Sequence, residues 1–379
     1  MHRLLLALAV TSVAATAHAA GDLDHLVFVP NRDSNDVSVI DTRTDTLTRR
    51  VAVGTNPHQV AISAELGLLV ATNSGANTLS IVDLSGAAAP TQLALDKVPE
   101  HMELSPGGNV LAVGNIEAGT VSLIDLPNRR EVHRVAGLDS PHNLTFTKDG
   151  AELYVANLGA DRVSVIDVAS GTLVKDIDLR QPRLVAGLNE PQDFQGVVNV
   201  TATPDGKLGF AAYGSGDGLA VLDLQKQEVV KTLTLGAMPW RAYGTADGRT
   251  MVVPNNGDET ISLIDVATQS EVARVPGAAD MTGVNMDAFA TAAFTLSRAE
   301  HKVVVVDLDR HATVGEIALP GSPETGVTTT DGKKLYVAIG DTNQVAVIDT
   351  ASRKLVRTID DVGSFPWGVH MMGAANYCH

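Results

Sequence analysis

The sequence predicts an all-β, eight-bladed propeller, and three observations lead to that prediction. The segment Asp36–Asp41 (DVSVID) returns with small changes along most of the chain. The aspartates that close its copies follow one another at intervals of 42 residues six times, with one interval of 56. Each copy also carries short runs in which apolar and polar residues alternate, which is the pattern of antiparallel strands joined by tight turns.

The repeated unit has the length of one propeller blade. Its closing aspartates are Asp41, Asp83, Asp125, Asp167, Asp223, Asp265, Asp307 and Asp349. A period of about 42 residues leaves room for about four strands. The aspartate ends the third strand, where its carboxylate can accept hydrogen bonds from backbone N–H groups of the next turn. We therefore interpret it as structural, not catalytic.

The phase of the repeat predicts how the ring closes. Residues 25–29 match the second strand of a unit, whereas residues 366–370 match a first strand. We therefore expect the C-terminal segment to complete the first blade, so that pairing of the two ends leaves no strand edge exposed. This phase gives eight blades, and a seven-bladed ring is the alternative.

Two segments carry a family resemblance: residues 331–338 (DGKKLYVA) and residues 153–157 (LYVAN). At these positions the chain resembles the YVTN-type β-propeller repeat family, and the resemblance covers nearly all of the mature chain. It implies the fold. It does not imply an activity, because such propellers serve as binding platforms, enzymes and surface proteins.

The first 19 residues have the pattern of a secretory signal peptide. Arg3 precedes a largely apolar run from Leu4 to Val13, and Ala17–Ala19 offers small residues for cleavage. The apolar run is too short to span a bilayer. We therefore expect a single propeller domain over residues 20–379, periplasmic or secreted, without membrane insertion.

Charge and cysteine content narrow the range of partners. The formal net charge of −16 becomes −17 when Arg3 leaves with the signal, and the remaining basic residues form no stripe. Nucleic acid and anionic lipid surfaces are therefore poor partners. The single cysteine, Cys378, excludes an internal disulfide, so burial and ring closure must hold the fold. We expect a monomer.

The interval of 56 residues contains a 14-residue insertion near residues 180–195, between the last strand of blade 4 and the first strand of blade 5. In a propeller, this connection lies on the face where first strands enter the central channel. The insertion can therefore cover the channel mouth. A solvated surface excursion is the alternative, and the sequence leaves both open.

Functional side chains are expected where first strands begin, since these strands line the channel. Aligned on the proline before them, the candidates are His58, Glu100 and His101, His142, Trp240 and Arg241, Glu324, and Trp367 with His370 three positions further. Blades 1 to 4 are neighbours, which predicts a metal site formed by His58, Glu100 or His101, His142 and His370. Imidazole with carboxylate suits copper or zinc, and the nearby Met371 and Met372 would favour reduced copper. The alternative is that these polar groups satisfy turn backbone or contact channel water.

Trp240 and Trp367 hold nearly equivalent positions and could sandwich a flat cofactor, with Arg241 meeting its carboxylates. Packing of the two rings over the channel rim is the alternative. The architecture is similar to the haem-binding propeller of periplasmic nitrite reductases, but haem is a less favoured ligand because no haem-specific motif is present. The sequence thus predicts a binding propeller for a small ligand or metal.

Two other functions remain open at this point. One is a cofactor-binding or oxidoreductase-type propeller for a modified haem or a quinone, and the other is a scaffold that binds another periplasmic protein. Whether the chain is an enzyme is left open. It contains no Gly-x-Ser-x-Gly, His-Glu-x-x-His, P-loop or Cys-x-x-Cys-His motif.

Overall fold

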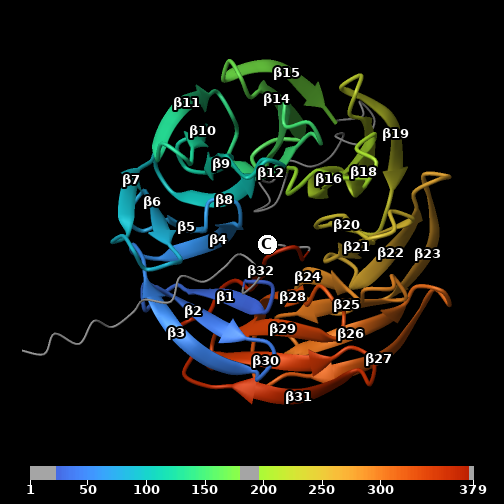
Figure 1. The fold of residues 1–379 in the computed structure, drawn as a ribbon. Helices are drawn as coiled ribbons and strands as arrows, with labels where there is room; N and C mark the ends of the chain where they lie inside the picture. The colour runs from blue at the N-terminus through green and yellow to red at the C-terminus, as the bar shows by residue number, and fades with distance from the viewer. Residues whose placement is uncertain (1–22, 180–195, 375–379) are drawn as a thin grey trace, which may run out of the picture.

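The computed structural model describes residues 23–179 and 196–374, which form eight four-stranded antiparallel sheets arranged as a ring (Figure 1). The prediction of an eight-bladed propeller is confirmed. The expected signal peptide, the insertion at residues 180–195 and Cys378 lie outside the described residues. Within the described part, no helix is long and apolar enough to cross a membrane.

The strands follow one another in chain order, and every blade except the first is one continuous segment. Blade 1 contains β1 (Leu26–Asn31), β2 (Asp36–Asp41), β3 (Thr46–Ala52) and β32 (His370–Met371). Blades 2 to 4 contain β4 (Pro57–Ser63), β5 (Leu68–Asn73), β6 (Thr78–Asp83) and β7 (Thr91–Ala94); β8 (Pro99–Leu104), β9 (Val110–Asn115), β10 (Thr120–Asp125) and β11 (Arg130–Ala136); and β12 (Pro141–Phe146), β13 (Glu152–Asn157), β14 (Arg162–Asp167) and β15 (Thr172–Asp178).

The second half of the ring repeats this order with two very short inner strands, β16 and β20. Blades 5 and 6 contain β16 (Thr201–Ala202), β17 (Leu208–Tyr213), β18 (Gly218–Asp223) and β19 (Glu228–Thr234), then β20 (Tyr243–Gly244), β21 (Thr250–Asn255), β22 (Thr260–Asp265) and β23 (Ser270–Pro276). Blades 7 and 8 contain β24 (Met281–Met286), β25 (Ala292–Ser297), β26 (Lys302–Asp307) and β27 (Ala312–Ala318), then β28 (Pro323–Thr328), β29 (Lys334–Ile339), β30 (Gln344–Asp349) and β31 (Lys354–Ile359).

The two ends of the described chain close the ring in blade 1. Strand β32 pairs antiparallel with β1, with His370 opposite Phe28 and Met371 opposite Val27. An isolated bridge between Asn31 and Pro366 extends the pairing. The predicted closure by N- and C-terminal strands is therefore confirmed, and it leaves the second strand of blade 1 without an open edge.

The recurring aspartate caps the turn after the third strand in all eight blades. Its Oδ1 accepts a hydrogen bond of 2.7–3.2 Å from a backbone N–H two or three residues further on. At Asp167 the hydroxyl and the backbone N–H of Ser170 both donate, and they hold the pKa of that carboxyl below its usual value. The carboxylate thus replaces water for turn N–H groups that have no partner in the sheet, which is the expected structural role.

A second recurring contact joins the second and third strands of five blades. A buried asparagine at the end of the second strand donates from Nδ2 to a buried serine hydroxyl at 2.9–3.0 Å. The pairs are Asn31–Ser38, Asn73–Ser80, Asn115–Ser122, Asn157–Ser164 and Asn255–Ser262. Because a buried amide without a partner is costly, this contact accounts for the conjunction of Asn and Ser in the repeat.

Gly54 provides a test of how tightly the Asn–Ser contact is packed. Its backbone N–H donates to Ser80 Oγ at 3.0 Å, and a Cβ at this position would lie 2.6 Å from Asn73 Cγ. We expect Gly54→Ala to lower the free energy of unfolding by roughly 1–3 kcal/mol, because the overpacked amide must move. Gly315→Ala is the matched control, since nothing lies within 4 Å of its added Cβ. Urea unfolding of both variants decides the matter, and equal stabilities would show that the contact is loosely packed.

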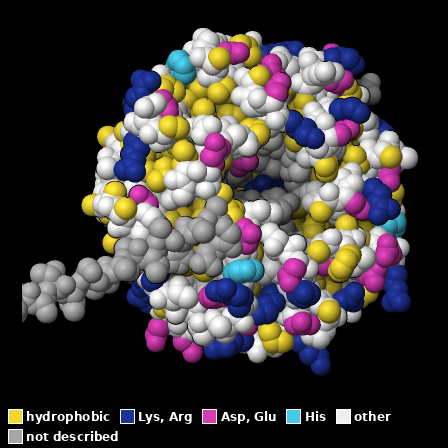
Figure 2. Space-filling view, viewed as in Figure 1, with side chains coloured by type: hydrophobic (Ala, Val, Ile, Leu, Met, Phe, Trp, Pro, Cys, Tyr) yellow, Lys and Arg dark blue, Asp and Glu magenta, His cyan; other side chains and the backbone are white. Residues whose placement is uncertain are grey.

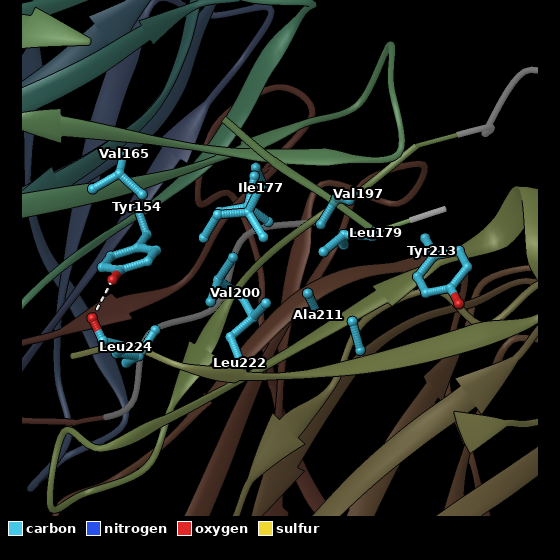
Figure 3. Packing of buried hydrophobic residues seen from close by; sticks show 13 residues of the cluster. Tyr154, Val165, Ile177, Leu179, Val197, Val200, Ala211, Tyr213, Leu222 and Leu224 are labelled. Atoms are coloured by element: carbon cyan, nitrogen blue, oxygen red, sulfur yellow. Dashed lines mark hydrogen bonds between the residues drawn. The ribbon is translucent and has the colours of Figure 1, made fainter. Parts of the chain in front are cut away.

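Neighbouring blades pack face to face through apolar side chains, as the contact between blades 4 and 5 illustrates (Figure 3). Tyr154, Val163 and Val165 from blade 4 meet Ala211 and Leu222 from blade 5, all with at most 1% exposure. The Tyr154 hydroxyl, buried within this contact, donates to the Leu224 carbonyl at 2.5 Å. Blade-to-blade burial of this kind holds the ring in the absence of an internal disulfide.

Candidate functional site

The channel side chains are positioned by one bridge that recurs in every blade. The first residue of each inner segment is bridged to the last residue of the second strand, as Pro57 is to Asn73 and Pro366 is to Asn31. In blades 2, 3, 4, 7 and 8 a break in strand register follows the bridge, and in blades 1, 5 and 6 the bridge stands alone, so that the next residue leaves the regular pairing. These eight residues, here called the inner ring, are Trp367, His58, Glu100, His142, Val198, Trp240, Thr282 and Glu324 in blade order.

A cavity of about 510 Å³ lies at the inner ring. The space-filling view shows the disc hollowed at its centre (Figure 2). Seven of the eight inner-ring residues line the cavity, together with His101. A second set of residues also lines the cavity, and each of them directly follows the last residue of a second strand. These residues, here called the rim residues, are Arg32, Ser74, Gly214, Asn256 and Arg298.

Three candidate metal ligands lie together on blades 2 and 3. One ligand atom from each of His58, Glu100 and His101 can be chosen so that all lie within 4.8 Å of one another. His58 and His101 are buried, and their rings meet edge to face with centroids 5.1 Å apart. The His142 ring lies against His101, with centroids 3.7 Å apart. Four of the five predicted metal ligands therefore line one cavity, from three adjacent blades.

The contacts of His142 favour one of its nitrogens as a ligand. Its Nδ1 lies 3.1 Å from the Val198 carbonyl oxygen, which can only accept, and 3.2 Å from Asn143 Nδ2, which can only donate. The shorter contact, to the carbonyl, favours the tautomer that carries the proton on Nδ1. The lone pair is then on Nε2, which is the form that binds a metal or accepts a proton. Burial lowers the pKa of His142 to about 4, which keeps the imidazole neutral at physiological pH.

Burial shifts the pKa of Glu100 in the opposite direction to that of His142. Burial raises the pKa of its carboxyl to about 7, and the charge of Arg32 acts in the other direction. The carboxyl would gain from a nearby cation, since a positive charge favours its ionised form. The neutral imidazole of His142 and a carboxyl that lacks full charge compensation are groups that a metal ion could bind.

The aromatic candidates stand on different walls of the cavity. Trp367 lies beside His58, with ring centroids 5.4 Å apart, and it stacks on Phe365 at 6.0 Å. Trp240 lines the cavity from blade 6. The residue after it, Arg241, is buried, and its Cζ lies 5.2 Å from the Tyr243 ring centroid. Arg241 is not among the residues that line the cavity, so it does not accompany Trp240 there.

His370 occupies a separate place further along blade 1. It lines a smaller cavity of about 160 Å³ with Gln59, Glu103 and Met372, which shares no lining residue with the larger one. It is 3% exposed and lies three positions beyond Trp367 in the chain. The structure thus brings His58, Glu100, His101 and His142 together, whereas His370 stands apart from them.

A model of the YNCE-like beta-propeller family matches residues 61–377. The chain belongs to this family. No curated protein matches it. Among solved structures, "Dihydro-heme d1 dehydrogenase NirN in complex with DHE" superposes with a TM-score of 0.76 at 17% identity, covering 93% of this chain and 76% of that one.

Two further structures share the fold of this YNCE-like propeller. Hydrazine synthase of Kuenenia stuttgartiensis has a TM-score of 0.60 at 22% identity, covering 78% of this chain and 96% of that one. A functionally unknown protein from Desulfotomaculum acetoxidans has a TM-score of 0.58 at 14% identity, covering 79% and 96%. At these identities the likeness concerns the fold, and function must be argued from the site.

Sequence reasoning missed the rim residues, although a signal for them was present. Arg32 and Arg298 each follow the residue that ends a second strand, and the same 42-residue frame that aligns the inner ring aligns them. A column-by-column reading of the eight repeats would have placed two arginines beside the predicted site.

Proposed function

We propose that this YNCE-like propeller is an exported binding protein that holds a transition metal at the mouth of its channel. The proposed ligands are His58, Glu100 and His101, with His142 available as a fourth. The observation that carries the proposal is the approach of three ligand atoms to within 4.8 Å inside a cavity. Export rests on the predicted signal at residues 1–19.

The donor set selects a class of metal. Two or three imidazoles with one carboxylate are typical of zinc and copper, whose ligands lie about 2.0–2.2 Å from the ion. Small rotations of side chains that already lie within 4.8 Å of one another can reach such distances. The rest of the 510 Å³ cavity leaves space next to the ion for another ligand, as in metal sites that keep an open position.

Metal analysis of protein purified without a chelating tag tests this proposal. We expect about one equivalent of copper or zinc in the native protein, and its loss in the variant His58→Ala with His101→Ala, because two of three ligands are removed. His301→Ala with His311→Ala is the matched control, since it removes two histidines that lie outside the site and should keep the metal. A native protein that takes up neither metal, or a site variant that retains it fully, would rule the site out.

A flat cofactor is the second candidate, favoured by one observation. Trp240 and Trp367 face a cavity large enough for a conjugated ring system, and a structural neighbour is described in complex with DHE. The donor set fits a haem-like group in part: His142 Nε2 could bind its metal ion, and Arg32 could pair with a carboxylate of the group. Arg241, by contrast, is not on the cavity wall.

Optical titration separates this candidate from a simple metal ion. A haem or quinone ligand should change its visible absorption on binding. Trp240→Ala should weaken the affinity measured from that change by roughly tenfold, because the ligand loses a stacking partner. Flat titrations with both ligand types exclude this candidate. A scaffold that binds another periplasmic protein becomes the favoured function if neither metal nor cofactor is bound.

A further inference from the structure

We propose that the cavity binds a small organic monocarboxylate, whose carboxylate pairs with Arg32 and contacts the metal while its apolar body faces blades 5 and 6. This inference rests on the proposed metal site and names the class of ligand that the site would take. It follows from the distribution of charge and apolar surface around the cavity, and from the way Arg32 is held.

The Arg32 guanidinium is oriented by two side chains, neither of which compensates its charge. Its Nε donates to Asn56 Oδ1 at 3.0 Å, and its Cζ lies 5.1 Å from the Trp367 ring centroid. Trp367 is itself stacked on Phe365. Among the described residues, no carboxylate oxygen lies within the 4.0 Å of an Arg32 nitrogen that defines an ion pair. The guanidinium is therefore fixed in place, with its terminal N–H groups available to an acceptor.

The second rim arginine differs in this respect. Arg298 Nε lies 2.9 Å from an Asp280 carboxylate oxygen, and its Nη1 lies 3.5 Å from Glu324. Two acidic groups thus offset its single charge before any ligand arrives. Among the described residues that line the cavity, Arg32 is therefore the cation that can recognise an anion. It lies near the proposed metal ligands, because the Trp367 ring contacts both its guanidinium and the His58 ring.

The wall opposite Arg32 is mostly apolar, with Asn256 as a polar side chain in it. In a closed ring of eight blades, blades 5 and 6 stand across the channel from blades 1 and 2, which carry Arg32 and His58. The apolar side chains that line the cavity there and at the start of blade 7 are Val198, Met238, Pro239, Trp240 and Met281. A ligand that is complementary to both walls has an anionic end, which faces Arg32, and an apolar body, which faces blades 5 and 6.

The charges in the wall favour a single negative charge over a phosphate or a dicarboxylate. Besides Arg32, the cavity contains the carboxyls of Glu100 and Asp280, and Asp280 is already paired. With a divalent metal in place, the formal charges of the metal, Arg32, Arg298, Glu100, Asp280 and Glu324 leave one positive charge, which one carboxylate balances. A second or third negative charge would lie against these carboxyls without a partner, which is costly in a partly dry cavity.

Calorimetric titration of the zinc-loaded full-length protein with benzoate and with benzamide tests the inference. Benzamide has the same shape and no charge. We expect benzoate to bind at least roughly tenfold more tightly, because it alone can form charge-assisted hydrogen bonds with a guanidinium. Arg32→Gln should abolish this preference and leave the zinc content unchanged. Arg310→Gln, which removes an exposed arginine of the β26–β27 turn, is the matched control and should keep the preference.

Zinc content and ligand preference, measured on the same samples, separate the two proposals. Zinc-loaded protein that binds the two ligands equally, or an Arg32→Gln variant that still prefers benzoate, overturns the carboxylate inference and leaves the metal site standing. A protein that takes up neither zinc nor copper overturns both proposals. If Arg32→Gln does not fold, the ratio of benzoate to benzamide affinity in the native protein decides alone.

Discussion

Deletion of residues 363–379 is expected to unfold the ring or to drive it into aggregates. The deletion removes β32, whose Met371 and neighbouring Val369 are buried between blades 8 and 1. Burial of two such side chains contributes roughly 3–6 kcal/mol, comparable with the whole stability of many domains. The deletion also removes the backbone hydrogen bonds from Arg32 N to Phe365 O and from Trp367 N to Pro30 O, each 2.9 Å long.

The deletion also exposes a strand edge, so its effect is larger than the loss of local contacts alone. Without the C-terminal segment, β1 presents unpaired N–H and C=O groups that can pair with another chain. Size-exclusion chromatography and thermal melting are the measurements, and we expect soluble aggregates or a melting temperature lower by more than about 10 °C. Deletion of residues 377–379 alone is the control and should leave both unchanged. A monomeric truncation that melts like the full-length chain would show that closure contributes little.

The blade count and the closure could be predicted from the sequence because both follow from period and phase. The aspartate that ends each third strand sets the period, and its role needs no neighbour outside its own turn, as the bond from Ser170 N to Asp167 shows. Closure needs one further inference, that residues 366–370 match a first strand. Local patterns that repeat eight times leave few alternative folds.

The irregular repeats keep the blade fold because other residues replace the contact made by the repeated asparagine. In blade 5, Tyr213 stands where five other blades have asparagine, and Gly218 stands where the other blades have residues with a side chain. A Cβ at Gly218 would lie 2.1 Å from the Tyr213 ring carbon Cζ, so glycine makes room for the ring. Blade 7 has Ser297 at the asparagine position, and its hydroxyl donates to the Ala279 carbonyl instead. Such pairs can be aligned in sequence, but their contacts depend on side-chain packing.

The candidate site could be predicted only in part, since sequence phase places a residue on a strand without fixing its height in the channel. His58, Glu100 and His142 share one phase and line one cavity, as expected for equal positions on neighbouring blades. His370 is three positions further along its segment, which carries it to another cavity. The depth of a residue along the channel matters as much as its blade.

His370 should make the metal-free protein sensitive to acid. It is 3% exposed, its Nε2 makes no hydrogen bond to any described residue, and burial lowers its pKa from 6.5 to about 4. Above pH 6.5 neither the folded nor the unfolded state binds a proton here, so the residue has no effect on stability. Between pH 6.5 and 4 the unfolded chain binds a proton that the folded state excludes, and stability falls by up to about 3 kcal/mol.

Urea unfolding of chelator-treated protein at pH 7 and pH 4.5 measures this effect. In His370→Gln the loss of stability between the two pH values should be smaller than in the native protein by about 2–3 kcal/mol, because glutamine does not titrate in this range. His311→Gln is the matched control, since it removes an exposed histidine at the β26–β27 turn and should leave the native pH dependence. If His370→Gln and the native protein lose stability equally, the His370 imidazole is protonated in the folded state, and water or a neighbouring group must reach its Nε2.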